Sequence, residues 1–273
     1  MTMTSILLKS NNFIALFENE EWLADCLKHS PVGQVHLAPD LGEAKLSLWA
    51  NACKRANKQA FLQIPGDGNL PEGQKALRWQ LKRLCDWIAA FFLLSVLSPI
   101  FLGLALLIRL TSPGQILFRQ WRVGQGGQLF EIFKFRTMVV GAEKLHYQVM
   151  CDCQGLHKRE NDPRLHRLGG WMRKYSLDEL PQLFNVLRGE MSLVGPRPWA
   201  LYDALRISPA GWKRLNALPG ITGFWQVEAR SKLLDLEAVT DCDLQYLRDW
   251  SLGKDFAILL KTIPCVLSGF GAV

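Results

Sequence analysis

Two adjacent carboxylates, Asp178 and Glu179, are the residues of this sequence best suited to chemistry. They fall in the first turn of a predicted helix, where acidic side chains often do no more than complement the helix dipole. Neighbouring side chains on a helix diverge by about 100°, so the two carboxylates can do different jobs. Arg173 precedes the pair, and Arg197 follows it in the rigid Pro196-Arg197-Pro198 segment. These flanking cations favour a chemical role over a purely structural one.

The chemistry that such a set performs best is attack on phosphorus. A carboxylate with a pKa near 4 is ionised at neutral pH and can serve as a nucleophile. A second carboxylate can bind Mg²⁺, which neutralises phosphate charge. Arginine guanidinium groups bind the phosphate oxygens that do not react.

Two further cations, Lys134 and Arg136, lie in a predicted β-hairpin. Residues 116–121 and 129–135 alternate as two short strands, and the glycine-rich residues 124–127 predict the turn between them. Side chains at i and i+2 point to the same side of a strand, so we expect Lys134 and Arg136 to form one phosphate-binding face. A solvated edge strand that resists aggregation is the alternative interpretation.

The carboxylate pair itself is predicted to open a helix. Ser176 with Glu179 three residues later fits a capping box. An apolar stripe follows at helical spacing, and Gly189 ends the helix. Pro181 is compatible with this helix because proline is tolerated in a first turn.

Residues 87–108 form an apolar run without a charged side chain. At about 1.5 Å per residue, the run is just long enough to cross a hydrocarbon core of roughly 30 Å. Ser98-Pro99 lies at its centre, and basic residues flank both ends. Because positive flanks tend to stay on the cytoplasmic side, we predict a re-entrant helix–break–helix hairpin with its membrane break at Ser98 and Pro99. A spanning helix with a proline kink and a buried core helix are the alternatives.

The rest of the chain divides into three predicted parts. Residues 1–65 read as a small soluble α/β accessory unit, with a protein-docking role expected because no glycine-rich phosphate loop follows its strands. Residues 66–75 form a turn-rich linker, and residues 76–273 form the membrane-anchored part. A C-terminal apolar stretch at 256–267 is expected either to pack in the core or to lie at the membrane interface, core packing being the more common outcome.

Composition narrows the functional classes. The 273 residues carry a formal net charge of +7, which suits a surface facing anionic headgroups or phosphates. A nucleic-acid partner is not expected, since no helix-turn-helix, RNA-recognition or zinc-finger pattern is present. Seven scattered cysteines favour reduced thiols, and no signal peptide is expected at the N-terminus. His146, Cys151, Cys153 and His157 match no common metal spacing, so a peripheral segment is expected there.

Several motifs resemble one family closely. The segments KFRTM, NDPR, RKYSLDELPQLFNVLRGEMSLVGPRP and PGITGFWQV are similar to those of the bacterial sugar transferases, over about residues 76–270. These are monotopic polyprenyl-phosphate hexose-1-phosphate transferases, which initiate exopolysaccharide and other envelope glycans. The resemblance implies that a UDP-sugar and polyprenyl (undecaprenyl) phosphate are the substrates and Mg²⁺ the cofactor. It also implies a place on the cytoplasmic face of the inner membrane.

The resemblance also implies roles for particular residues. Asp178 would attack the β-phosphorus of the UDP-sugar, expel UMP and carry a covalent phosphosugar, which polyprenyl phosphate then accepts. Glu179 would help to bind Mg²⁺, and the re-entrant break would be at Ser98-Pro99. The residues expected to bind substrate are Lys134, Arg136, Arg173, Arg197, Arg230 and Asp243, with Arg136 assigned from the strand pattern and the others from the family motifs.

The expected fold class is therefore α+β: a membrane-associated, mainly helical catalytic domain with a re-entrant hairpin, a short β-hairpin and a small N-terminal α/β unit. A catalytically silent, membrane-anchored scaffold that recruits glycan enzymes through residues 1–65 is the alternative function. A basic nucleic-acid binder is a further alternative, supported only by the net charge.

Overall fold

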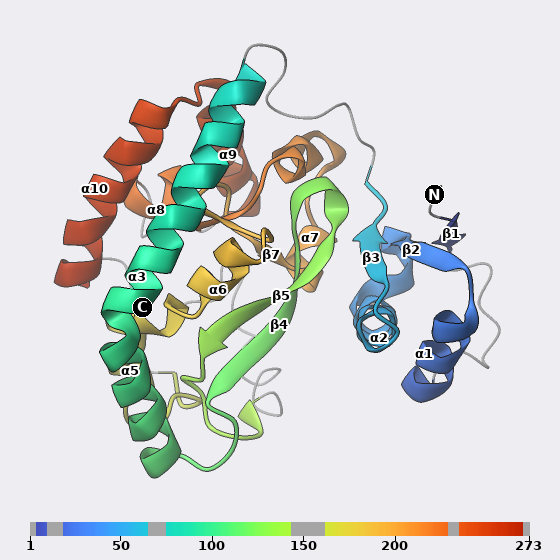
Figure 1. Ribbon diagram of the computed structural model, residues 1–273, viewed down its shortest axis with the longest axis horizontal. Helices are drawn as coiled ribbons and strands as arrows, with labels where there is room; N and C mark the ends of the chain where they lie inside the picture. The colour runs from blue at the N-terminus through green and yellow to red at the C-terminus, as the bar shows by residue number, and fades with distance from the viewer. Residues whose placement is uncertain (1–3, 10–18, 65–74, 143–161, 229–234, 270–273) are drawn as a thin grey trace.

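The computed structural model describes residues 4–9, 19–64, 75–142, 162–228 and 235–269. Its elements mix helix and sheet, as expected for an α+β chain. Figure 1 shows the N-terminal elements at one side, a long helix at the other, and the β-hairpin between them. Residues 66–74 of the predicted linker, Arg230 and the His146–His157 set lie outside the described residues.

The N-terminal elements form a parallel three-stranded sheet with helical connections. The strand order is β1-β2-β3, and both strand pairs are parallel. Parallel neighbours require crossover connections, and here the helices α1 and α2 lie between the strands in the chain. Buried Val35, Leu37, Ala60 and Leu62 alternate along β2 and β3 and face the core. The elements are β1 (Thr4–Leu8), α1 (Glu20–His29), β2 (Val32–Leu37), α2 (Gly42–Arg55) and β3 (Gln59–Leu62).

The apolar run lies in one helix, α3 (Lys75–Thr111). The predicted break of secondary structure at Ser98-Pro99 is corrected: Pro99 lies inside the helix. Figure 1 shows that the helix changes direction along its length without folding back on itself. Proline removes one helical hydrogen bond and typically kinks a helix, and the Ser98 hydroxyl donates to the Ser95 carbonyl at 2.8 Å beside it. The chain therefore bends here and does not turn back as a hairpin of two separate helices.

The predicted β-hairpin is confirmed. Strand β4 (Leu117–Val123) pairs antiparallel with β5 (Leu129–Phe135). Gly126 and Gly127 take φ values of 64° and 80°, which glycine adopts without the steric penalty of a side chain. A short third strand, β7 (Trp199–Ala200), pairs with the other edge of β4. This last pairing brings the segment after Arg197 onto the hairpin.

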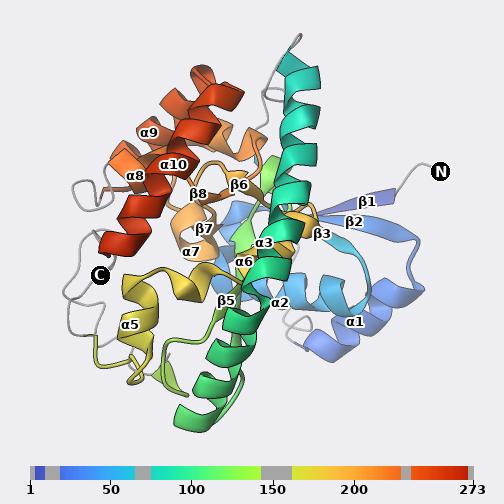
Figure 2. The same ribbon diagram turned by 60° about the vertical axis from the view of Figure 1, so that its left-hand side comes forward.

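The remaining elements surround the hairpin and α3. Strands β6 (Ser192–Val194) and β8 (Gly220–Thr222) pair in parallel. Figure 2 shows α10 beside α9 and α8 at the C-terminal end of the chain. The helices are α5 (Gly169–Lys174), α6 (Gln182–Leu187), α7 (Leu201–Ala204), α8 (Phe224–Glu228), α9 (Leu236–Arg248) and α10 (Leu252–Ser268), and the short 3₁₀ turns are Pro39–Leu41, Gln125–Gly127, Leu177–Glu179 and Pro209–Asn216.

One hydrophobic cluster joins the N-terminal unit to the rest of the chain. It contains Leu46 and Trp49 from α2 together with Trp199, Leu201 and Ile207. Burial of apolar surface is the main favourable contribution to folding, so these residues stabilise the two parts jointly.

Candidate active site

The carboxylate pair lies on a 3₁₀ turn, Leu177–Glu179, immediately before α6. Ser176 has a left-handed backbone with φ of 51°, whereas a capping residue needs an extended one. The predicted capping box is therefore wrong. A non-glycine residue in this conformation costs roughly 1–2 kcal/mol, and such strain is concentrated at functional sites.

Asp178 is almost fully buried, with 8% of its surface exposed. Burial raises the pKa of Asp178 to about 6. Neighbouring Glu179 also raises the pKa, whereas Lys134 and Arg173 lower it, and the value of about 6 is the balance of these effects. The carboxylate is thus ionised at neutral pH but poorly solvated, which favours nucleophilic reactivity.

Glu179 pairs with Lys134 across the site. The Lys134 Nζ lies 2.7 Å from Glu179 Oε1, and both side chains are about one-fifth exposed. Strand β5 presents the lysine, and the 3₁₀ turn presents the acid. The structure therefore brings together three predicted site residues: Asp178, Glu179 and Lys134.

Arg173 approaches the pair from α5. Its Nε donates to the Thr137 hydroxyl at 3.0 Å, and its Nη1 lies 4.0 Å from Asp162. Asp162 in turn binds Arg164 at 2.6 Å, which holds its pKa below the usual value despite the opposing effect of burial. Burial lowers the pKa of Arg173, and the charge of Asp178 is the largest effect that opposes this. Arg173 remains cationic beside the proposed nucleophile.

The Pro196-Arg197-Pro198 segment is held through its carbonyl groups. The Gly220 amide donates to Pro196 O at 2.8 Å, Arg214 donates to Arg197 O at 2.8 Å, and Arg122 donates to Pro198 O at 3.0 Å. Two of the three residues are prolines without an N–H, so carbonyl acceptors are the main means of fixing this backbone. The Arg197 guanidinium lies 5.4 Å from the Trp225 ring centre. Its position is thus set by both backbone and ring contacts.

These residues converge on a narrow, polar cleft. Burial and the nearby charge of Arg197 lower the pKa of Arg122 to about 10, so the Arg122 guanidinium is still protonated at neutral pH. Together with Lys134, the two arginines place three cations around Glu179. Cations in this arrangement suit a diphosphate. The lining residues are Arg122, Ile132, Lys134, Glu179, Gln182, Arg197, Pro198, Ile221 and Gln226.

Two residues predicted to bind substrate lie elsewhere. Arg136 follows the end of β5, and its guanidinium donates to the Ser112 and Pro113 carbonyls at 2.9 and 2.6 Å. Asp243 is 1% exposed and pairs with buried Arg214. Through Arg214 it supports the backbone of Arg197. The structure thus gives both residues supporting contacts, and neither lines the polar cleft, where we expected them to bind substrate.

Arg122, Gln182 and Gln226 line the cleft, although we did not predict them as site residues. Arg122 could have been found from the register of the hairpin. It is paired with Phe130, and positions 130, 132 and 134 of β5 share one face, so Arg122 lies on the same face as Lys134. Gln226 lies near the end of the PGITGFWQV motif, and our prediction of a substrate-binding residue fell on Arg230 further along the chain. The Gln226 Nε2 donates to Ile221 O at 3.2 Å.

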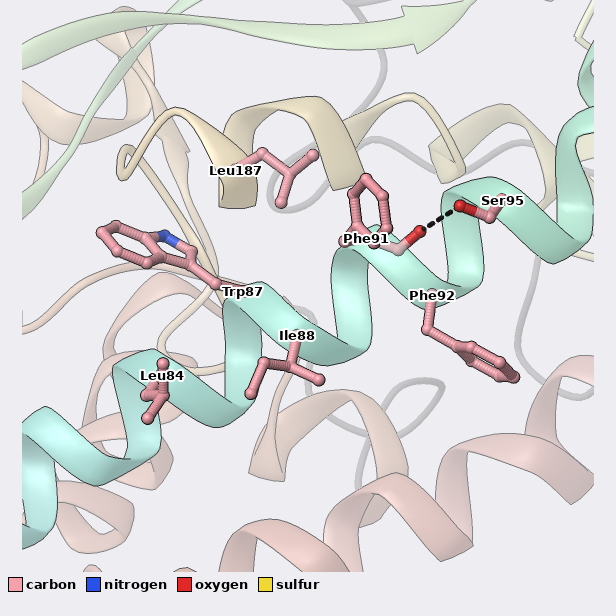
Figure 3. A pocket seen from close by; sticks show the side chains of 7 residues that line it. All are labelled: Leu84, Trp87, Ile88, Phe91, Phe92, Ser95 and Leu187. Carbon is pink, nitrogen blue, oxygen red and sulfur yellow. Dashed lines mark hydrogen bonds between the residues drawn. The ribbon is translucent and has the colours of Figure 1, made fainter.

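An apolar groove runs along α3 beside α6 (Figure 3). Its volume is about 730 Å³. The Trp87 indole donates to Val186 O at 3.1 Å, which fixes this wall of the groove to α6. Gln182 of the polar cleft and Leu187 of the groove lie at the two ends of α6. The groove is lined by Leu84, Trp87, Ile88, Phe91, Phe92, Ser95 and Leu187.

The protein side chains of the site could bind Mg²⁺ only if substrate phosphates supplied further ligands. Within the described ranges, His, Cys, Asp and Glu side chains form no group of three or more suited to a metal ion. Mg²⁺ is, however, commonly held by one or two carboxylates plus substrate phosphates and water. Glu179 lines the cleft and supplies one such carboxylate, and the adjacent, buried Asp178 offers a second.

Comparison with known proteins gives a consistent result. The sequence profile described as "Bacterial sugar transferase" matches residues 77–269. Galactosyl transferase CpsE of Streptococcus agalactiae is 39% identical over 70% of this chain, although the match spans only 43% of that protein. Exopolysaccharide production protein ExoY of Rhizobium meliloti is 37% identical over 74% of this chain and 94% of its own length. UDP-glucose:undecaprenyl-phosphate glucose-1-phosphate transferase of Caulobacter vibrioides is 41% identical over 76% of both chains.

Proposed function

The chain belongs to the bacterial sugar transferase family, and on that premise we propose that it is a polyprenyl-phosphate sugar-1-phosphate transferase. It transfers hexose-1-phosphate from a UDP-sugar to undecaprenyl phosphate and releases UMP, as the first step of exopolysaccharide or other envelope glycan synthesis. The names of relatives that act on undecaprenyl phosphate support these substrates. The single structural observation that carries the proposal is buried Asp178 beside a cleft lined by three cations.

Asp178 is proposed as the nucleophile. Its carboxylate oxygen forms a bond to the β-phosphorus, and the bond from that phosphorus to the bridging oxygen breaks, so that UMP leaves. An oxygen of polyprenyl phosphate then attacks the same phosphorus and releases the aspartate. Lys134, Arg122 and Arg197 bind the phosphate oxygens and stabilise the charge that develops on the leaving UMP. Arg173 and Lys134 keep Asp178 ionised against the effect of burial.

Mg²⁺ is the proposed cofactor, with Glu179 as its protein ligand. The ion would supply charge neutralisation at the diphosphate. Glu179 would then exchange its contact with Lys134 for the ion, which leaves the lysine available to a phosphate oxygen.

The membrane is the proposed site of action, on its cytoplasmic face, where nucleotide sugars are found. Helix α3 is long enough and apolar enough to cross a membrane, and only 11% of its most apolar window is buried. Helix α10 buries Asp255 and Ile258 but exposes four large apolar residues, which favours the interface over the core. These four are Phe256, Leu260, Ile263 and Leu267.

A re-entrant path remains the proposal for α3, now with a bent helix in place of two separate ones. Basic flanks at both ends and the bend at Pro99 support it. Single cysteines at Arg78 and Gln115, which lie on opposite sides of the apolar run, test it with an impermeant label. Labelling from one side of the membrane only supports re-entry, and labelling of the two positions from opposite sides shows a spanning helix.

The decisive experiment measures UMP release from a panel of UDP-sugars with polyprenyl phosphate. At least one UDP-sugar should yield UMP with the wild type, and no UDP-sugar should yield UMP with Asp178→Asn. A covalent phosphosugar adduct should be trapped on the wild type alone. Asp249→Asn is the matched control, because this exposed aspartate lies outside the cleft. A catalytically silent scaffold would instead leave Asp178→Asn fully functional in cells, and that result would reject the enzyme.

A further inference from the structure

The N-terminal unit, residues 4–64, packs against the β4–β5 hairpin, although it lies outside the part matched by the family profile. Figure 1 shows the unit beside the hairpin. Two side chains of α2 make polar contacts there. The Trp121 indole donates to Asn51 Oδ1 at 2.8 Å, and Lys54 Nζ lies 2.5 Å from Glu131 Oε2.

The two contacts involve one cross-strand pair of the hairpin. Trp121 on β4 and Glu131 on β5 are directly opposite partners. Asn51 and Lys54 are three residues apart and therefore share one face of α2. One helix face thus binds both strands of the hairpin at the same cross-strand pair, which fixes the strands relative to each other.

The opposite face of the same strands forms the wall of the polar cleft. Successive side chains on a strand point to opposite sides, so Arg122 and Ile132 face away from Trp121 and Glu131. Lys134 shares the face of Ile132 and reaches the cleft too. The N-terminal unit therefore lies directly behind the cations of the cleft.

The unit also contacts the turn of the hairpin and the segment after Pro198. Phe61 of β3 forms an isolated antiparallel bridge with Gln128. A side chain at Gly127 would meet the Leu62 carbonyl at 2.3 Å, so only glycine allows this close approach. Helix α2 packs against α7, which begins three residues after Pro198. The N-terminal unit thus contacts both the turn of the hairpin and α7, the two elements next to the cleft wall.

We propose that the N-terminal unit is a built-in positioning element of the active site, in which Asn51 and Lys54 fix the β4–β5 hairpin so that Arg122, Lys134 and Arg197 converge on the diphosphate. Displacement of a binding group by about 1 Å can reduce turnover by about 100-fold. The inference rests on the proposed function for its kinetic test. A positioning role differs from an accessory docking role, because docking would require neither the Asn51–Trp121 nor the Lys54–Glu131 contact.

The test compares the full chain with the double variant Asn51→Ala/Lys54→Ala in membrane-mimetic particles. We expect kcat/KM for the UDP-sugar to fall about 10- to 100-fold, with KM for polyprenyl phosphate unchanged. Exchange of the charges, Lys54→Glu with Glu131→Lys, should restore part of the loss relative to Lys54→Glu alone. Lys28→Ala is the matched control, because Lys28 pairs with Asp25 on its own helix and both side chains are exposed.

A second readout needs no turnover. Calorimetric binding of UDP should weaken about tenfold in the double variant, since the cations of the cleft bind the diphosphate. If the wild type releases no UMP but UDP binding still depends on Asn51 and Lys54, the proposed reaction fails while the positioning role stands. Trp121→Phe removes the indole N–H that donates to Asn51, keeps an aromatic ring, and serves if the double variant does not fold. Unchanged kcat/KM and unchanged UDP affinity in a folded variant overturn the inference.

Discussion

At the residue scale, the central feature is a buried aspartate that stays ionised. Asp178 is 8% exposed, and burial raises its pKa to about 6 while Lys134 and Arg173 oppose this rise. Catalytic groups commonly have their pKa values shifted toward the working pH in this way. The same burial removes the water that would otherwise weaken the nucleophile.

The raised pKa predicts the acid limb of the pH–rate profile. Only the ionised carboxylate can attack phosphorus, so kcat/KM for UMP release should be flat near pH 7 and fall with a slope of about one below pH ~6. A stopped assay from pH 4.5 to 8 measures this limb. An acid limb centred near pH 4, the ordinary value for aspartate, would contradict the effect of burial.

The same shift predicts a stability effect of opposite sign to that of an ordinary ion pair. Because the pKa is higher in the folded state than in the unfolded state, the folded protein binds more protons between pH ~4 and ~6. This group therefore disfavours folding above pH 6, and its effect disappears as the pH falls towards 4. We expect Asp178→Asn to melt at a higher temperature than the wild type at pH 7, with the difference vanishing near pH 4. A lower melting temperature at pH 7 would contradict this.

At the element scale, a buried polar network attaches the long helix to the catalytic part. Lys82 of α3 is 3% exposed and lies 2.8 Å from Asp255 of α10. The Tyr246 hydroxyl donates to the same carboxylate at 2.6 Å. One turn along α3, Asp86 accepts a hydrogen bond from Ser192 at 2.7 Å, on the strand that leads to Pro196. The helix is thus fixed to the elements that lead to the Pro196-Arg197-Pro198 segment.

Removing one partner of this network should be strongly destabilising. Lys82→Met would leave Asp255 buried without its counter-charge, which typically costs about 3–5 kcal/mol. Urea unfolding in detergent micelles measures the change, and Lys28→Met provides an exposed control. A loss below about 1 kcal/mol, the size typical of exposed pairs, would show that the pair is not buried in solution.

The exposed apolar face of α10 should contribute to membrane binding. Leu260 is 52% exposed, so Leu260→Glu should preserve the fold but weaken association with vesicles, because a charge would enter the interface. Gln245→Glu introduces the same charge on an exposed position of α9 and should bind like the wild type. Flotation with vesicles of mixed anionic and neutral lipid compares the two. Equal flotation would exclude α10 from the contact.

At the scale of the whole molecule, residues 4–64 share a hydrophobic cluster with the catalytic part. Leu46, Trp49 and Val35 contribute to it from the N-terminal side, and Trp199 and Leu201 from the other. A cluster of this kind unfolds as a unit when either side is removed, because the remaining apolar surface becomes exposed to water.

Deletion of residues 1–64 should therefore yield an aggregated or unfolded chain. Solubility in mild detergent and the sharpness of the thermal transition measure this. Ile6→Ser, at an exposed position of the edge strand, is the control and should behave like the wild type. A deleted chain that melts as cooperatively as the full one would show that the two parts fold independently.

The sequence alone was sufficient for features that depend on local pattern. Alternation and glycine turns predicted the β4–β5 hairpin, and the resemblance of several motifs predicted the family. These features could be found because strand period, turn chemistry and neighbouring residues are visible along the chain.

Only the tertiary structure decided how distant residues meet. The left-handed Ser176, the pairing of Asp243 with Arg214 and the position of Arg136 all depend on contacts between elements far apart in sequence. The proline at 99 bends α3 and does not break it, because the helical hydrogen bonds on either side outweigh the one that is lost. The sequence thus determined which residues are chemically suited to the site, whereas long-range packing decided which of them line the cleft and which support it.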